Sequence, residues 1–272
     1  MPELPEVQTT VKGLQSIVGA TIKSINIINP NLRWPIQIDK FHQLINLKIH
    51  SISRRAKYIE IDFGFFWLII HLGMTGRLFI VREKAILNKH DHVEFALKKP
   101  NQTLIFNDVR RFGSMHLVEK NKLDQFFLYK ELGPEPLLEG FNVDYLFKVS
   151  RNKKISVKSL IMNSKYVVGV GNIYANEALF LSKIKPTRIA QKLKKLECEK
   201  LVINIKKILK LAIKKGGTTI KDFMNPSQGS GYFQINLRVY GKENLACPVC
   251  STKILRIVQN QRSSFYCSVC QS

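Results

Sequence analysis

The first residues of this 272-residue chain could do nucleophilic chemistry, because they read Met1-Pro2-Glu3-Leu4-Pro5-Glu6. Removal of Met1 would leave Pro2 with a free secondary amine, and an α-amino group has a pKa of about 8. Attack of such an amine on a sugar or carbonyl carbon gives an iminium ion, which can accept electrons in later eliminations. Glu3 and Glu6 lie three residues apart, on one face of a helix, where either could transfer a proton. Proline and acidic residues also favour a first helical turn for structural reasons, so the pattern by itself leaves both interpretations open.

Four cysteines near the end of the chain could hold a metal ion. Cys247 and Cys250 form one C-x2-C pair, Cys267 and Cys270 form another, and 16 residues separate the pairs. Two such pairs joined by a hairpin are typical of a tetrahedral structural zinc site. Two disulfides are the alternative, which the absence of a signal-peptide pattern disfavours. We expect the fifth cysteine, Cys198, to be a partly buried thiol without a role.

The charge of the chain points to a polyanionic partner. Its 43 basic and 20 acidic residues give a net charge of +23, and residues 151–272 hold 23 of the basic but only 5 of the acidic ones. A folded region this positive normally faces nucleic acid, although basic residues that only decorate the surface are the alternative. A hydrophobic content of 45% excludes a disordered chain, and no apolar run reaches the roughly 20 residues of a membrane helix.

Hydrophobic periodicity predicts an N-terminal half rich in strands and a C-terminal half rich in helices. Residues 3–18 are expected to form an amphipathic helix that ends at Gly19. Strands are predicted at Thr21–Ile28, Leu47–Ile52, Lys57–Phe63, Phe66–Leu72, Leu78–Val81, His92–Leu97 and Thr103–Phe106. Helices are predicted at Val157–Met162, Asn172–Ser182 and Lys192–Lys215. Residues 218–235 read as a glycine-containing loop. Many short strands followed by helices indicate an antiparallel sandwich joined to a helical domain.

Short motifs along the whole chain resemble those of bacterial formamidopyrimidine-DNA glycosylases, which excise oxidised purines from DNA. The opening Pro2-Glu3-Leu4-Pro5-Glu6-Val7 carries the resemblance first. The other motifs are Arg54-Arg55-Ala56-Lys57-Tyr58, His71-Leu72-Gly73-Met74-Thr75-Gly76, Lys89-His90-Asp91-His92-Val93, Asp108-Val109-Arg110-Arg111-Phe112-Gly113, Leu132-Gly133-Pro134-Glu135-Pro136-Leu137, Val168-Gly169-Val170-Gly171-Asn172-Ile173-Tyr174-Ala175, Gly217-Thr218-Thr219 and Gln261-Arg262-Ser263-Ser264-Phe265-Tyr266-Cys267.

The resemblance implies a catalytic set. Pro2 would attack C1′ of the damaged nucleotide, and Glu3 would protonate the opening sugar, with Glu6 as a supporting acid. Lys57, which we place in a strand, would reach a phosphate or the sugar, and Arg262 would hold the phosphates beside the lesion. For Lys57 the structural alternative is a solvated strand lysine.

The resemblance also implies residues that bind DNA. Met74, Arg110 and Phe112 would fill the hole left by a flipped nucleotide, although composition by itself would place Met74 and Phe112 in the core. His90, Lys153 and Asn172 would contact phosphates, Asn172 next to glycines at a helix start. A metal site at His90-Asp91-His92 is disfavoured, because successive residues of a strand point to opposite faces.

These observations predict an α+β, multidomain DNA glycosylase and abasic-site lyase with one structural Zn2+. Its partner would be double-stranded DNA with oxidised bases, and we expect a cytoplasmic, nucleoid-associated monomer. The expected domains are an antiparallel β-sandwich with flanking helices at 1–132, a linker at 133–150, a helix–two-turns–helix domain with a lesion loop at 151–235 and a zinc-finger hairpin at 236–272. The alternatives are a related glycosylase for oxidised pyrimidines and a non-enzymatic zinc-ribbon protein that binds damaged DNA.

Overall fold

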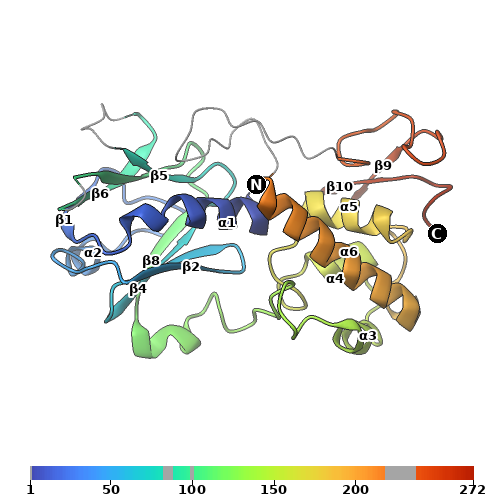
Figure 1. The fold of residues 1–272 in the computed structure, drawn as a ribbon, viewed down its shortest axis with the longest axis horizontal. Helices are drawn as coiled ribbons and strands as arrows, with labels where there is room; N and C mark the ends of the chain where they lie inside the picture. The colour runs from blue at the N-terminus through green and yellow to red at the C-terminus, as the bar shows by residue number, and fades with distance from the viewer. Residues whose placement is uncertain (1, 82–87, 99–100, 218–236) are drawn as a thin grey trace. The chain divides into compact units, whose positions relative to one another are not determined.

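The computed structural model describes residues 2–81, 88–98, 101–217 and 237–272. These residues divide into two compact units (Figure 1). The first unit comprises the described residues of Met1–Lys130 and Gly216–Phe233, and the second those of Glu131–Lys215 and Gln234–Ser272. The predicted loop at 218–235 lies outside the described residues.

The first unit is built on two antiparallel four-stranded sheets. One sheet has the strand order β1-β6-β7-β5 and the other β2-β3-β4-β8. The strands are β1 (Ile22–Ile27), β2 (Ser51–Arg55), β3 (Tyr58–Asp62), β4 (Phe66–His71), β5 (Arg77–Val81), β6 (Asp91–Leu97), β7 (Thr103–Asn107) and β8 (Ser114–Glu119). The helical segments are α1 (Leu4–Gly13), η1 (Gln15–Ile17), α2 (Ile38–His42) and η2 (Lys120–Gln125). One buried core draws on both sheets and on α1, as the predicted antiparallel sandwich with flanking helices requires.

Helix α1 is shorter than the predicted helix at 3–18. It ends at Gly13, and a 3-10 turn at Gln15–Ile17 follows after Leu14. Its apolar side chains Val7 and Val11 are buried in the core between the sheets, and the ribbon passes alongside strands of both sheets (Figure 1). The apolar stripe therefore identified the buried face correctly, but the helix ends at Gly13, five residues before its predicted end at Val18.

One predicted strand is displaced in the structure, and one observed strand was not predicted. The strand predicted at Leu47–Ile52 begins only at Ser51 and runs on to Arg55, and β8 was not predicted at all. The β8 sequence Ser-Met-His-Leu-Val-Glu lacks a clear alternation, so pairing with β4 along its whole length decides its structure. In β4, Leu68, Ile69 and Ile70 are all fully buried, which agrees with a strand covered on both faces.

The second unit is helical and ends in a two-stranded hairpin. Its elements are α3 (Val143–Ser150), α4 (Val157–Met162), α5 (Asn172–Leu181), η3 (Ala190–Lys192), α6 (Lys195–Lys214), β9 (Leu255–Gln259) and β10 (Arg262–Tyr266). Residues from all four α-helices form one core. Residues 133–150, expected as a linker, instead contain α3, whose Leu146 is buried in that core.

The structure also shows the environment of the fifth cysteine and the character of the helices. Cys198 is fully buried on α6 rather than partly buried, and burial raises the pKa of its thiol to about 11. No helix in the described part of the chain is long and apolar enough to span a bilayer.

Two glycines allow close backbone approaches in the loop after β4, Gly73 to the chain before β8 and Gly76 to Leu72 within the loop. Gly73 has φ +60°, and a Cβ there would lie 2.4 Å from the carbonyl carbon of Phe112. A Cβ on Gly76 would lie 2.3 Å from the backbone oxygen of Leu72. Only glycine fits either position without a backbone shift.

We therefore predict that Gly76→Ala destabilises the protein by about 1–3 kcal/mol, because the added methyl group must displace backbone. Thermal unfolding measures this as a lower Tm. Gly140→Ala is the control: its Cβ would meet only Pro134 Cβ at 3.6 Å, an ordinary contact. Equal Tm values for the two variants would contradict the close approach.

Candidate active site

The N-terminal motif forms a buried cluster at the start of α1. Pro2 is buried, and Glu3 and Glu6 are 2% and 0% exposed. Glu3 is the N-cap residue: its side chain accepts from the backbone of Glu6, and its backbone N–H donates to Glu6 Oε2 at 2.9 Å. This reciprocal pair is a capping box, and the positive end of the helix dipole favours both carboxylates there. Two carboxyl groups are thus fixed in position beside the proline.

The Gly216–Gly217 segment approaches this cluster closely. Gly217 has φ +90°, and a Cβ on it would lie 3.0 Å from Glu6 Oε1. The segment therefore covers the Glu6 carboxyl in a way that a residue with a side chain would obstruct.

Lys57 lies in the tight turn between β2 and β3, and not in a strand as predicted. Arg55 pairs with Tyr58 across the turn, which leaves Ala56 and Lys57 as its two central residues. Ala56 has φ +54°, and Lys57 is half-buried. Lys57 is therefore placed at the end of the β2–β3 hairpin and not on a face of the sheet.

The Lys57 ammonium also acts on His71, which sequence reasoning did not single out. Tyr58 pairs with His71 between β3 and β4, and the two rings lie 5.1 Å apart. Burial, and next the positive charges of Lys57 and Arg33, lower the pKa of His71 to about 4. The His71 ring is therefore neutral near pH 7, and its Nδ1 accepts from Gly73 N at 3.1 Å.

Met74, Arg110 and Phe112 lie together, as the resemblance implied. Arg110 Nη1 lies 3.3 Å from Met74 Sδ, and its guanidinium lies 4.5 Å from the centroid of the Phe112 ring. Phe112 is 44% exposed, and Met74 is partly exposed, so the reading of these two as core residues is wrong. The three side chains form an apolar and cationic cluster at the surface of the first unit.

A buried carboxylate, Asp108, builds the loop that carries this cluster. It is 0% exposed; its Oδ1 accepts from Thr75 Oγ1 at 2.5 Å and from Arg110 N at 3.2 Å, while Oδ2 accepts from Gly113 N at 2.7 Å. Sequence reasoning assigned it no role. The sequence did contain a signal for this loop, because an aspartate at the start of a segment that ends in glycine is typical of a turn held by the aspartate side chain.

His90 precedes β6 and is half-buried, and its backbone O accepts from Asp108 N at 3.0 Å. Asp91 accepts from Asn107 Nδ2 at 2.7 Å and from Asn88 N at 2.8 Å, and His92 Nε2 lies 2.8 Å from Asp108 O. Both neighbours of His90 are therefore bound within the protein, and they do not group with it as metal ligands in the described residues.

In the second unit, Lys153 follows α3 and is half-buried. Its Nζ lies 5.2 Å from the centroid of the Tyr166 ring, and its backbone O accepts from Gln191 N at 3.1 Å.

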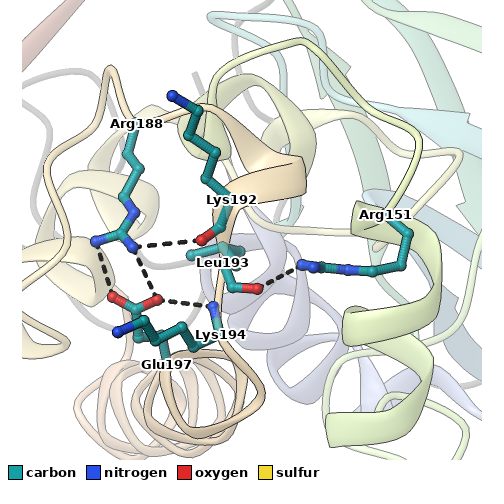
Figure 2. A network of polar contacts seen from close by, with 6 residues as sticks. All are labelled: Arg151, Arg188, Lys192, Leu193, Lys194 and Glu197. Carbon is teal, nitrogen blue, oxygen red and sulfur yellow. Dashed lines mark hydrogen bonds and ion pairs between the residues drawn. The ribbon is translucent and has the colours of Figure 1, made fainter.

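The chain around Gln191 is held by the polar network of Figure 2. Arg188 forms an ion pair with Glu197 at 2.8 Å and donates to Lys192 O at 3.3 Å. Glu197 accepts from Lys194 N at 2.8 Å, and Arg151 donates to Leu193 O. The network fixes residues 188–197, which lead into α6 and include the Gln191 that binds the Lys153 backbone.

Asn172 is the first residue of α5, directly after Gly171. Asn176, 1% exposed, donates from Nδ2 to Asn172 O at 2.6 Å and accepts on Oδ1 from Phe265 N at 2.7 Å. One side chain thus joins the first turn of α5 to strand β10.

Arg262 is exposed at the start of β10, after a turn in which Asn260 and Gln261 both have positive φ. The residues after it are anchored by Lys158, 2% exposed, which donates to Ser263 O at 2.8 Å and to Ser264 Oγ at 2.7 Å. The hairpin therefore presents Arg262 from a strand fixed to α4 and α5.

The four predicted zinc ligands lie together. The sulfurs of Cys247, Cys250, Cys267 and Cys270 are all within 4.8 Å of one another, with Cys250–Cys267 at 3.4 Å and Cys247–Cys270 at 3.9 Å. Tetrahedral Zn–S bonds of about 2.3 Å place sulfurs about 3.8 Å apart, so the group fits Zn2+.

The chemistry of the donors agrees with a cation. Hydrogen bonds from Thr252 lower the pKa of Cys250 to about 6, whereas Cys250 raises the pKa of Cys270 to about 12. Four thiolates this close require a positive charge between them. Because all four positions are filled by protein, one structural zinc ion is held and no site for catalytic water remains.

The predicted residues are thus distributed over both units. Pro2, Glu3, Glu6, Lys57, Met74, His90, Arg110 and Phe112 belong to the first, and Lys153, Asn172, Arg262 and the four zinc ligands to the second.

Three family models match the chain. The N-terminal domain of formamidopyrimidine-DNA glycosylase matches residues 1–115, the H2TH domain of formamidopyrimidine-DNA glycosylase matches 132–224, and a zinc finger found in FPG and IleRS matches 245–272.

Curated relatives match over the full chain. The formamidopyrimidine-DNA glycosylase of Hydrogenovibrio crunogenus is 48% identical over 272 residues, which cover 100% of this chain and 96% of that protein. The Pasteurella multocida protein of the same name is 46% identical over 100% of this chain and 99% of its own length.

Solved structures agree with this fold. A Lactococcus lactis FPG variant bound to DNA with Fapy-dG is 34% identical and covers 100% of both chains with a TM-score of 0.91. The Lactococcus lactis protein bound to DNA with an abasic site matches with the same identity and TM-score over 99% of both chains. With three matching family models and full-length relatives, this chain belongs to the formamidopyrimidine-DNA glycosylase family.

Proposed function

We propose that the chain excises oxidised purines from double-stranded DNA and then cleaves the strand at the abasic site, with the Pro2 amine as nucleophile. The observation that carries this proposal is the cluster at the start of α1, where Pro2 lies beside two buried carboxyl groups. The relatives are DNA glycosylases by name, and the Lactococcus lactis protein has been solved with lesion-containing DNA. A non-enzymatic zinc-ribbon protein, one of the two alternatives, does not agree with membership of this family of enzymes.

The first step forms the bond between the Pro2 nitrogen and C1′ and breaks the C1′–base bond, whose electron pair leaves with the base. The departing base takes up a proton, and the Pro2 nitrogen loses the proton it carried as a secondary amine. Glu3, held at the N-cap, then protonates O4′ as the C1′–O4′ bond breaks and the iminium ion forms. Glu6, bonded to the Glu3 backbone, supports this position.

Strand cleavage follows from the iminium ion, which accepts electrons when a C2′ proton leaves. The 3′ phosphate departs in this β-elimination, and the 5′ phosphate departs in a second, δ-elimination. Lys57 and Arg262 are cations suited to the phosphates and the sugar of this nucleotide. Water finally releases the enzyme from the sugar fragment.

Access to C1′ requires the damaged nucleotide to leave the duplex. Met74, Arg110 and Phe112 would enter the hole: Phe112 as a flat wedge, and Arg110 as a donor to the base left opposite. His90, Lys153 and Asn172 would hold the flanking phosphates, the last at a helix start.

A second candidate substrate class is oxidised pyrimidines. The Lactococcus lactis protein has also been solved with DNA that contains an oxidised pyrimidine, at a TM-score of 0.90 and 34% identity. Excision rates on matched oxidised-purine and oxidised-pyrimidine duplexes would rank the two classes.

We further propose that the chain acts as a monomer in the bacterial cytoplasm and associates with the nucleoid through its substrate.

Pro2→Gly should keep duplex binding but lose most base excision, because a primary amine has different basicity and geometry while phosphate contacts stay intact. Single-turnover excision and a binding titration measure the two properties separately. Near-normal excision by the variant would contradict Pro2 as the nucleophile.

Zinc removal should abolish lesion cleavage while the first unit stays folded. Structural zinc sites contribute about 10–16 kcal/mol to the folding of small domains, and the hairpin has little apolar core beyond its cysteines. Loss of the hairpin would release Arg262 from its fixed position. Activity and circular dichroism of chelated protein, verified as metal-free, test this; retained cleavage would show that the metal is dispensable.

Arg110→Ala should reduce discrimination between opposite bases more than it reduces DNA affinity. A bidentate contact to O2 and N3 of cytosine is worth about 1–3 kcal/mol, or roughly ten- to a hundredfold. The measurement is single-turnover excision of 8-oxoguanine opposite cytosine and opposite adenine. Lys153→Ala is the matched control, which should weaken all duplexes alike and flatten the salt dependence. An unchanged ratio for Arg110→Ala would contradict its role.

A further inference from the structure

Arg54 connects the helix that carries the N-terminal cluster to the turn that carries Lys57. It lies on β2, where its Nε donates to Gln8 Oε1 on α1 at 3.0 Å. Its Nη1 donates to the backbone O of Ala56 at 2.8 Å. One planar guanidinium group therefore holds both elements at once.

Both ends of this connection lie close to proposed catalytic groups. Gln8 is one helical turn beyond Leu4, the first residue of α1, and Glu3 caps that helix. Ala56 immediately precedes Lys57 and has φ +54°, a conformation that residues with a Cβ rarely adopt. A hydrogen bond to the Ala56 carbonyl stabilises that conformation and hence the direction in which Lys57 leaves the turn.

A second contact joins the 3-10 turn η1, which follows α1, to the same strand farther from the cluster. Gln15 Nε2 donates to Ile52 O at 3.0 Å, and also to Val11 O at 3.0 Å. This contact secures the far end of α1 on β2 but does not touch the Lys57 turn. The Gln15 contact therefore serves as a matched control for the Gln8 contact. Removal of either contact weakens the attachment of α1 to β2, but only the Gln8 contact reaches the Lys57 turn, through Arg54.

We propose that Arg54 and Gln8 are positioning residues for the reaction, because together they set Lys57 relative to Pro2 and Glu3. The inference rests on the proposed function, in which these three residues act on one nucleotide. Arg54 suits the task because its rigid fork can donate in two directions, which a lysine ammonium on a flexible stem does less well.

The decisive variant is Gln8→Met, which keeps the length of the side chain but removes the acceptor of Arg54 Nε. It removes this one link between the helix and the turn and leaves the bond from Arg54 to Ala56 O in place. Small misplacements of catalytic groups are costly, so we expect the single-turnover excision rate to fall about tenfold to a hundredfold. DNA affinity and Tm should change no more than in the control Gln15→Met, whose excision rate should stay near that of the unmodified chain.

Gln8→Glu tests the chemistry of the contact. A carboxylate keeps the acceptor and forms a charge-assisted bond to the guanidinium, so this variant should excise at a rate within about twofold of the unmodified chain. A loss equal to that of Gln8→Met would overturn the inference.

A double variant, Gln8→Met in a chain that also carries Lys57→Ala, shows whether the loss of excision rate arises through the position of Lys57. If Gln8 acts by placing Lys57, Gln8→Met should cost little further activity in a chain that already lacks the ammonium group. Fully additive losses would overturn the positioning role, as would equal excision rates for Gln8→Met and Gln15→Met.

Failure of the proposed function gives a different result. An unmodified chain that neither excises 8-oxoguanine nor forms a borohydride-trapped adduct would overturn the function, and the positioning role with it. Normal activity of the unmodified chain with an unaffected Gln8→Met variant would overturn the positioning role only.

Discussion

The chemistry proposed for this chain depends on the reciprocal hydrogen bonds between Glu3 and Glu6 at the start of α1. A proline amine at the end of a chain would otherwise sample many positions, because terminal residues have few contacts to hold them. Here Glu3 is fixed as the N-cap, Glu6 is fully buried, and Pro2 precedes them directly. The helix dipole stabilises both carboxylates, and the burial of Val7 and Val11 holds the helix itself between the sheets. The core of the sandwich thus determines where the amine lies.

The second unit must also hold a site residue, Arg262, in place, but the hydrophobic cluster beneath its hairpin is small. Its hairpin cluster contains Phe180 from α5, three further buried hydrophobic residues and two of the cysteines. So small a core cannot hold a strand pair firmly in water. Zinc supplies most of the missing stability, while Lys158 and Asn176 fix strand β10 to the helices through buried hydrogen bonds. The exposed Arg262 and the helix-start residue Asn172 are consequently tied to one rigid body, as binding of successive phosphates requires.

Sequence patterns predicted most of this architecture but not its long-range polar contacts. The bounds of α4 were predicted in full, and α5 ends one residue before its predicted end, because glycines and caps mark both helices locally. Strand β8 and the placement of Lys57 in a turn were missed, since cross-strand pairing decides them and periodicity does not report pairing. The exposure of Phe112 could not be predicted from periodicity either. An aromatic residue is usually buried, but Phe112 lies in the loop that Asp108 holds by hydrogen bonds, where it is exposed.

Among the site residues, too, local spacing predicted some, whereas others needed the family resemblance or the folded structure. The zinc ligands were predicted from spacing alone, because two C-x2-C pairs have little other use in such a chain. Pro2 and Glu3 needed the resemblance, since their pattern also fits an ordinary helix start. Gln8 and Arg54 stand 46 positions apart and carry no motif that joins them, so only the folded structure reveals their contact.

The most direct test of the central claim is to locate the atom that bonds to DNA. The unmodified chain is incubated with a duplex that contains 8-oxoguanine, reduced with borohydride and digested, and the peptide attached to the sugar is sequenced by mass spectrometry. We predict a single adduct on the α-nitrogen of Pro2, in a peptide that lacks Met1. An adduct on a lysine side chain such as Lys57, or an adduct-free chain that still excises the base, would contradict it.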